Sequence, residues 1–422
     1  MGLGQSAKKK PCDLNGEVNF DHFQILRSIG KGSFGKVCIV RKKDNKQMYA
    51  MKYMSKAACL EKDASHHVLR ELDILQKLEH PFLVNLWFSF QDEEDMFMVV
   101  DLLLGGDLRY HMGQDVTFTE EVVRFYICEL VLALDYLRSR NILHRDLKPD
   151  NILLDEQGHV HLTDFNVATV LRENELATSL SGTKPYMAPE VYMTALEMCR
   201  GYSYSVDWWS LGVVAYEMLR RKRPYHIHTV TSLQEVVHQF ETTGVHFSSQ
   251  WSKDMCNLLR KLLSVDIDQR LCSLCEMKQH SAMSGVDWDG LQARTLPSPF
   301  VPPKDHLNCD PTFELEEMII ESKPLHKKKK RLAKQHSQDR RQSNNAELQN
   351  PLQPQLDQLQ RQFKVYNRER RKQEEQAAAD RLDAGVPERK RSFIDLMVRR
   401  SERKESTVKN PNAGAHLKVE EG

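Results

Sequence analysis

Residues 144–151 read HRDLKPDN, and the short segment TDFN follows at residues 163–166. Apolar residues flank the first stretch, Ile142 and Leu143 before it and residues 152–154 after it. This pattern predicts a polar loop that is fixed between buried strands. Together the two segments contain a carboxylate that can orient a hydroxyl group, an amide and a second carboxylate that can hold a metal ion, and a lysine. Such a set suits phosphoryl transfer.

A glycine-rich segment, residues 30–37 with the sequence GKGSFGKV, follows a strand-like run at residues 23–29. Glycine lets backbone amides approach phosphate oxygens, because no Cβ stands in the way. Dinucleotide-binding units carry similar glycines, but there a helix begins directly after them. Here the β-branched run 37–40 follows, so the loop is expected to connect two strands of a hairpin.

A third strand is predicted at residues 48–53, with Lys52 among apolar neighbours. A single lysine in a strand often only faces solvent. Residues 67–78, however, have three leucines at helical spacing on one face, with Glu71 offset from that face. An ion pair between Lys52 and Glu71 would hold the ammonium group at the α- and β-phosphates of a nucleotide.

Downstream of these strands the pattern becomes helical. Two glycines at 105–106 suit a hinge between two lobes, and residues 120–138 carry apolar residues at helical spacing, which is typical of a buried helix. A segment rich in Ser, Thr, Glu and Asn separates Asn166 from the sequence APE at 188–190. This composition predicts a surface loop with hydroxyl groups that can be phosphorylated.

Residues 23–281 resemble a eukaryotic protein kinase domain, because the glycine loop, strand lysine, helix glutamate, HRDLKPDN, DF, APE and the sequence DWWSLG at 207–212 occur in order. The segments PFLV, GGD, GT and PFVPP resemble the AGC group of kinases. The amino-terminal stretch and the DFN variant resemble the YANK serine/threonine kinases, the kinase 32 family. This family resemblance covers roughly residues 1–322.

The resemblance implies an α+β, bilobal eukaryotic protein kinase fold, with a β-rich N-lobe at 23–102 and an α-rich C-lobe at 103–281. It also implies an AGC-like tail at 282–322. Residues 1–22 form an amino-terminal segment with a candidate acylation site at Gly2, although this short pattern could also be a chance match in a disordered polar start. Residues 323–422 complete the chain as a basic tail, whose composition predicts large-scale disorder. Leu356, Leu359, Phe363 and Tyr366 have helical spacing, but no convincing Phe-x-x-Phe docking element is found.

The resemblance further implies a protein serine/threonine kinase that uses ATP and Mg²⁺, with Mn²⁺ as a second candidate metal. Asp146 would orient the substrate hydroxyl and accept its proton, Lys148 would steady the transferred phosphoryl group, and Lys52 and Glu71 complete the catalytic set. The metal ligands would be Asn151 and Asp164. The ATP-binding residues would be Ile29, Gly30, Lys31, Gly32, Ser33, Phe34, Gly35, Lys36, Val37, Ala50, Lys52, Val100, Asp101, Leu103 and Leu153.

Four positions are expected to bind the protein substrate. Asp107, Asp150 and Glu217 match acidic positions that receive basic side chains upstream of the phosphoacceptor, although they could also be surface acids with no such role. Thr183 and Lys148 follow the serine/threonine pattern. Ser179 matches the activation-loop phosphorylation site, with Arg145 and His67 as its expected cationic partners.

Asn166 departs from the kinase pattern, because glycine usually follows Asp-Phe. Asparagine tolerates positive φ better than most residues, so the loop can keep its geometry. The metal ligands and both lysines are retained, which favours an active enzyme over a nucleotide-binding scaffold that signals through its tail.

The composition and the two ends of the sequence indicate which partners the protein has and where it lies in the cell. The formal net charge is +1, so no nucleic acid partner is expected. The sequence has nine irregularly spaced cysteines, no amino-terminal apolar segment and no run of about 18 apolar residues. These features predict a reduced cytoplasmic protein. We also expect the protein to be monomeric. Gly2 fits the N-myristoylation pattern, and the lysines at 8–10 and 327–330 could add attraction to an anionic membrane, although the second run also fits a nuclear signal.

Overall fold

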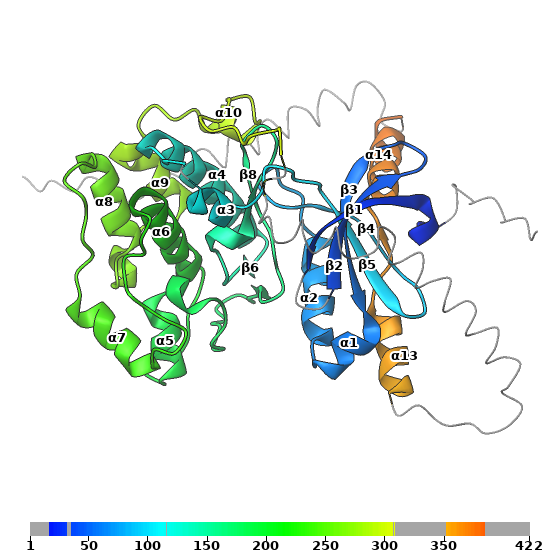
Figure 1. Cartoon of the computed structure of the whole chain (residues 1–422), viewed down its shortest axis with the longest axis horizontal. Helices are drawn as coiled ribbons and strands as arrows, with labels where there is room; N and C mark the ends of the chain where they lie inside the picture. Colours follow the sequence, from blue (N-terminus) through cyan, green and yellow to red (C-terminus); the bar gives the residue numbers. More distant parts are fainter. Residues whose placement is uncertain (1–16, 32–34, 115, 307, 309–351, 385–422) are drawn as a thin grey trace, which may run out of the picture. The chain divides into compact units, whose positions relative to one another are not determined.

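The computed structural model describes residues 17–31, 35–114, 116–306, 308 and 352–384. The chain divides into two compact units, Met1–Tyr366 and Asn367–Gly422. The first unit has a β-rich part and a helical part (Figure 1). In the second unit the structure describes the helix α14 (Arg368–Ala384). Among the helices of the described residues, none is long and apolar enough to cross a bilayer.

The β-rich part is built on an antiparallel sheet in the order β1-β2-β3-β5-β4, extended beside β4 by β10 (Tyr366–Asn367). Strands β1 and β2 form the predicted hairpin, and β3 continues into two helices. One face of the sheet is covered by buried aromatic rings, including the stacked Phe90 and Phe97. The elements are β1 (Phe23–Lys31), β2 (Gly35–Lys42), β3 (Met48–Ser55), α1 (Lys56–Glu61), α2 (Ser65–Leu75), β4 (Leu86–Gln91) and β5 (Asp95–Val100).

The helical part surrounds the long helix α4 (Glu120–Ser139), which Thr119 caps through the backbone amide of Val122. Its apolar residues are buried, as their spacing predicts, and α4 packs against α6. The other helices are α3 (Leu108–Gly113), α5 (Pro189–Ala195), α6 (Ser205–Arg220), α7 (Leu233–Thr242), α8 (Lys253–Leu262), α9 (Leu274–Gln279) and α10 (Trp288–Gln292). The predicted bilobal α+β fold is therefore confirmed.

Two small antiparallel ribbons hold the HRDLKPDN loop. The strand β6 (Ile142–Leu143) precedes the loop and pairs with β9 (Thr169–Val170). The strand β7 (Ile152–Leu154) follows it and pairs with β8 (Val160–Leu162). The loop itself includes a short 3-10 helix, η2 (Pro149–Asn151). The apolar flanks noted in the sequence are thus the strands that fix the loop at both ends.

The segment after the helical part returns to the connector between the two lobes. The side-chain nitrogen of Asn308 donates to the carbonyl oxygens of Leu104 and Pro303, at 3.2 and 2.8 Å. Gly106 has φ +77°, and a Cβ there would lie 2.1 Å from the carbonyl oxygen of Asn308. Glycine is therefore required at 106 by the close approach of the tail as well as by its backbone conformation.

Residues 352–366 differ from the expected disordered tail. They form α13 (Gln353–Gln362), which packs on α1, and a short extension that lies beside β4. Leu359 and Phe363 are each 2% exposed and belong to the main core. The helical spacing of these two residues was noted in the sequence, but spacing alone does not indicate which surface they cover. Polar contacts fix the segment further, since Ser89 Oγ donates to the carbonyl oxygen of Lys364 at 2.7 Å, and Lys364 Nζ lies 2.8 Å from Asp73 Oδ1 on α2.

Replacing Phe363 with alanine is expected to destabilise the first unit by about 3 kcal/mol, because a buried ring is lost and a cavity remains. A thermal unfolding experiment on the full chain measures this as a clear drop in Tm. Val365 is 55% exposed, so Val365→Ala is the matched control and should leave Tm nearly unchanged. Equal Tm values for the two variants would contradict the packing of this segment.

Candidate active site

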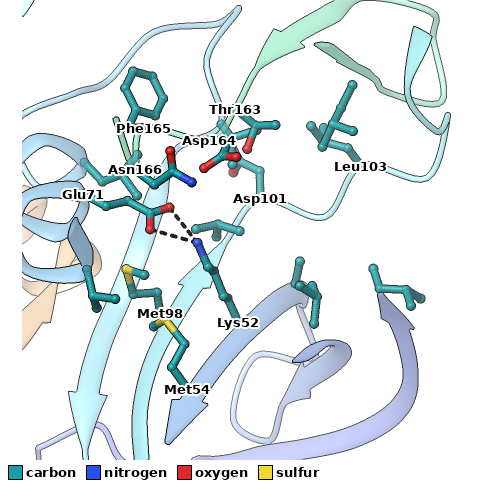
Figure 2. A pocket seen from close by; sticks show the side chains of 18 of the residues that line it. Lys52, Met54, Glu71, Met98, Asp101, Leu103, Thr163, Asp164, Phe165 and Asn166 are labelled. Atoms are coloured by element: carbon teal, nitrogen blue, oxygen red, sulfur yellow. Dashed lines mark hydrogen bonds and ion pairs between the residues drawn. The ribbon is translucent and has the colours of Figure 1, made fainter. Parts of the chain in front are cut away.

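A cavity of about 300 Å³ lies where the sheet faces the strands around the HRDLKPDN loop. A small, mostly apolar cavity with a few charged groups is typical of a site for a small ligand. Eight residues of the predicted ATP set line it: Ile29, Val37, Ala50, Lys52, Val100, Asp101, Leu103 and Leu153. Figure 2 shows Asp164, Phe165 and Asn166 near the charged end of the cavity.

The strand lysine and the helix glutamate meet in this cavity. Lys52 Nζ lies 2.9 and 2.8 Å from the two carboxylate oxygens of Glu71 (Figure 2). Burial alone would lower the pKa of Lys52, but the carboxylates of Glu71 and Asp164 outweigh it and raise this pKa above its ordinary value. The ammonium group therefore stays charged, as binding of nucleotide phosphates requires.

The predicted phosphate-binding loop is described only at its two ends. Gly30 and Lys31 pair with Val37 and Lys36 in the β1–β2 hairpin, whereas Gly32, Ser33 and Phe34 lie outside the described residues. A Cβ on Gly35 would lie 1.8 Å from the carbonyl oxygen of Tyr53. Glycine at 35 is thus required by the close approach of β3, in addition to the access for phosphate oxygens that the sequence suggested.

Three side chains converge on Asp146, whose own side chain is 9% exposed. Thr183 Oγ1 donates to Asp146 Oδ1 at 2.6 Å, and Lys148 Nζ donates to Asp146 Oδ2 at 2.8 Å. The side-chain nitrogen of Asn151 donates to the same Oδ2 at 3.0 Å, and Lys148 also donates to Thr183 Oγ1 at 2.9 Å. Since the nitrogen of Asn151 is engaged, its side-chain oxygen remains as the ligand atom for a metal ion. The three catalytic-loop residues and Thr183 therefore form one hydrogen-bonded cluster.

Asp207 on α6 holds the start of this loop from behind. Its two carboxylate oxygens accept from the backbone amides of His144 and Arg145, each at 2.8 Å. Burial raises the pKa of Asp207, although the nearby His144 and Arg145 oppose this effect. The sequence showed Asp207 only as part of a motif, and no positioning role was assigned to it. The signal was an acid at the start of an otherwise apolar helix.

A second buried carboxylate holds the end of the activation segment. Arg270 donates from its two terminal nitrogens to the two oxygens of Glu190, at 2.6 and 2.9 Å, and both side chains are buried. Such a two-pronged contact fixes orientation as well as charge. Glu190 belongs to the sequence APE, so the pair ties this motif to the chain 80 residues later. The sequence did not predict this partnership.

The activation-loop serine lies beside one of its two expected cationic partners. The guanidinium of Arg145 donates to Ser179 Oγ at 2.6 Å, and Tyr202 donates to the carbonyl oxygen of Ser179 at 2.6 Å. His67 is instead 3.1 Å from the carbonyl oxygen of Asn166. His67 thus links α2 to the DFN segment, and its role as a cationic partner of a phosphate group on Ser179 stays a prediction.

Asn166 does not need the backbone freedom of glycine in this arrangement. The described non-glycine residues with positive φ include Asp164, at 66°, and Arg145, at 71°, but Asn166 is not among them. The left-handed position thus lies at the metal-ligand candidate, two residues before the substitution. Asparagine at 166 is therefore accommodated without backbone strain.

The expected substrate-binding acids already have partners within the chain. Asp107 caps α3 and accepts from the backbone amide of Tyr110 at 2.7 Å. Burial raises the pKa of Asp107, and the nearby carboxylate of Asp150 adds to this effect. The guanidinium of Arg109 pairs with both Asp150 and Glu217. Sequence reasoning assigned no role to Arg109.

Comparisons with known proteins agree with this geometry. The protein kinase domain family matches residues 23–283. Human serine/threonine-protein kinase 32B is 58% identical over 91% of this chain and 92% of its own length, and human serine/threonine-protein kinase 32C is 57% identical over 91% and 80%. A RAC family serine/threonine-protein kinase homologue of Dictyostelium discoideum is 39% identical over 70% of this chain and 66% of its own length. The chain therefore belongs to the protein kinase family, and it is a serine/threonine kinase similar to kinases 32B and 32C.

Proposed function

We propose that this ATP-dependent serine/threonine kinase is catalytically active through Asp146, Lys148, Asn151 and Asp164, with Lys52 held by Glu71. The observation that carries this proposal is the hydrogen-bonded cluster on Asp146. One carboxylate there contacts a lysine, an amide and a threonine hydroxyl, with all contacts between 2.6 and 3.0 Å. The cluster fixes the orientation of this carboxylate, as the positioning of a substrate hydroxyl requires.

Binding of the nucleotide and metal is assigned to residues around the cavity. The apolar residues Val37, Ala50 and Leu153 line it and are suited to enclose a planar base. Asp164 and the side-chain oxygen of Asn151 form an all-oxygen ligand pair, which fits Mg²⁺, and Mn²⁺ accepts the same ligand type. When bound, the metal ion neutralises charge on the phosphate oxygens.

The choice of acceptor rests on Lys148 and Thr183, which contact each other and the catalytic carboxylate. The proposal is tested by incubating the full chain with labelled ATP, Mg²⁺ and peptide libraries that differ only in the acceptor residue. Phosphate is expected on serine and threonine peptides and absent from tyrosine peptides. The absence of transfer to every library, with Mg²⁺ and with Mn²⁺, would contradict the proposed function.

Two modifications are proposed on separate grounds. Acylation of Gly2, which lies outside the described residues, is supported by the sequence MGLGQS and the lysines at 8–10, and it would attach the kinase to anionic membranes. Phosphorylation of Ser179 is supported by its exposure and by the contact with Arg145, which can pair with a phosphate group. Mass spectrometry of protein purified from eukaryotic cells is expected to find both groups. An unacylated Gly2 would remove the proposed membrane attachment, and an unmodified Ser179 in active protein would remove the second proposal.

A further inference from the structure

Arg109 lies on α3 and joins three parts of the helical lobe. Its Nε lies 3.3 Å from Asp150 Oδ2 on η2, and one terminal nitrogen lies 3.1 Å from Glu217 Oε1 on α6. The other terminal nitrogen donates to the hydroxyl of Tyr186. All three partners are polar groups near the catalytic loop. Asp150 precedes the ligand candidate Asn151 directly, and Tyr186 follows Thr183 by three residues.

The carboxylate of Glu217 depends on this contact. Its side chain is 9% exposed, and it accepts from Arg109 through Oε1 and from the Tyr186 hydroxyl through Oε2, at 2.6 Å. A buried carboxylate without a cationic partner is strongly unfavourable. Burial opposes the charge on Arg109, but its hydrogen bond to Glu217 and the surrounding acids raise the pKa of the guanidinium. Both oxygens of Glu217 are thus engaged by groups of the chain itself.

The same acids are the ones that the resemblance assigned to a basic side chain of the substrate. We propose that Arg109 is a specificity residue that fills this acidic subsite from within, so that substrates need no basic residue upstream of the phosphoacceptor. This inference rests on the proposed kinase activity and concerns its substrate class. An arginine of the substrate would have to displace Arg109 from Glu217. The contacts that Arg109 loses would then be as many as those that the substrate arginine forms.

Asp150, at the edge of the acidic subsite, is held less firmly by Arg109 than Glu217 is. The Asp150 side chain is 49% exposed and contacts Arg109 only through Nε, at the longer distance of 3.3 Å. A basic residue of the substrate can therefore reach Asp150 without removing Arg109 from Glu217. Exposed ion pairs contribute little free energy, so this contact gives at most a weak preference for basic peptides.

The inference is tested with two serine peptides that are identical except for arginine or glutamine at one upstream position, repeated for each of the four positions before the acceptor. For the unmutated kinase, the ratio of kcat/KM between the arginine and glutamine peptides is expected to stay below about fivefold at every position. In Arg109→Ala the buried Glu217 lacks its cation, so the ratio should rise at least about tenfold at one position. The double variant Arg109→Ala/Glu217→Gln should lose this gain, because no buried charge then attracts the peptide.

If Arg109 has a purely structural role, Arg109→Ala changes kcat/KM equally for the arginine and glutamine peptides. The ratio then stays unchanged, which would overturn the inference. A ratio above about tenfold in the unmutated kinase would also overturn it. Arg124→Ala, which removes an exposed arginine from α4, is the matched control for net charge and should not change the ratio. If Arg109→Ala fails to fold, Arg109→Lys takes its place, because lysine keeps the charge but cannot contact Asp150, Glu217 and Tyr186 together, and its ratio should rise about threefold.

Failure of this inference and failure of the proposed function give different results. Without kinase activity, the unmutated protein phosphorylates neither peptide. With activity but without the proposed specificity role, both peptides are phosphorylated and the ratio does not respond to the variants. ATP affinity, measured on each variant, should match that of the unmutated chain, because Arg109 does not line the nucleotide cavity.

Discussion

Replacing Asp146 with asparagine is expected to lower kcat by about 10³-fold, within the range of 10²–10⁴ that a positioned general base contributes. Both oxygens of Asp146 accept hydrogen bonds, Oδ1 from Thr183 and Oδ2 from Lys148 and Asn151. An amide nitrogen in either position would face a donor group. The variant therefore loses the negative charge and also disturbs the cluster that holds the substrate hydroxyl.

Steady-state kinetics with a serine peptide measure this effect. The affinity for ATP should change by less than about threefold, because Asp146 does not line the nucleotide cavity. Asp63→Asn is the matched control, since Asp63 is exposed in a turn with φ 49°, where asparagine is well tolerated. A kcat within tenfold of the unmutated value would show that the carboxylate of Asp146 is not the catalytic group.

Replacing Asp164 with asparagine is expected to lower kcat by about 10³-fold as well, because a hard oxygen anion at the metal site is lost. Asparagine is preferred to alanine here. The backbone of Asp164 has φ 66°, a conformation that asparagine adopts at lower cost, so the effect reports on charge rather than on strain.

A binding experiment separates the metal role of Asp164 from its other contacts. Nucleotide affinity is measured with and without Mg²⁺, and the unmutated chain should bind more tightly when Mg²⁺ is present. In Asp164→Asn this dependence on Mg²⁺ should disappear, whereas Lys52 keeps its partner Glu71. An unchanged response to Mg²⁺ would exclude Asp164 as a metal ligand.

The parts of the site that the sequence predicted share one property. They lie in short motifs that resemble those of protein kinases, namely Lys52, Glu71, Asp146, Asn151 and Asp164, and the structure places them at the cavity or in the cluster. The bilobal fold followed from the same motifs together with the change from strand to helix patterns after residue 100.

The contacts that the sequence did not predict join residues far apart in the chain. Glu190 meets Arg270, and Arg109 meets Glu217, across 80 and 108 residues. Spacing carries no information on such pairs, because they depend on how helices pack. The same reason applies to Phe363, whose helical spacing was noted but whose burial depends on how residues 352–366 pack. There α13 contacts α1, and Gln91 on β4 donates to the carbonyl oxygen of Phe363.

At Asn166, the sequence pattern suggested a backbone conformation that the structure does not have. Because glycine usually follows Asp-Phe, the sequence suggested a positive φ at residue 166, but in the structure the positive φ falls on Asp164. The carbonyl oxygen of Asn166 contacts His67 on α2 while Lys52 and Glu71 are paired. The DFN segment is therefore compatible with an assembled active site.

We propose that these residues form an active serine/threonine kinase despite Asn166. The most direct measurement is transfer of labelled γ-phosphate from ATP to a serine peptide by the purified full chain, with Asp146→Asn prepared in parallel to detect contaminating kinases. We expect transfer that requires Mg²⁺ or Mn²⁺ and that falls to background in Asp146→Asn. No transfer by the unmutated chain with either metal, or equal transfer by the two proteins, would contradict the claim.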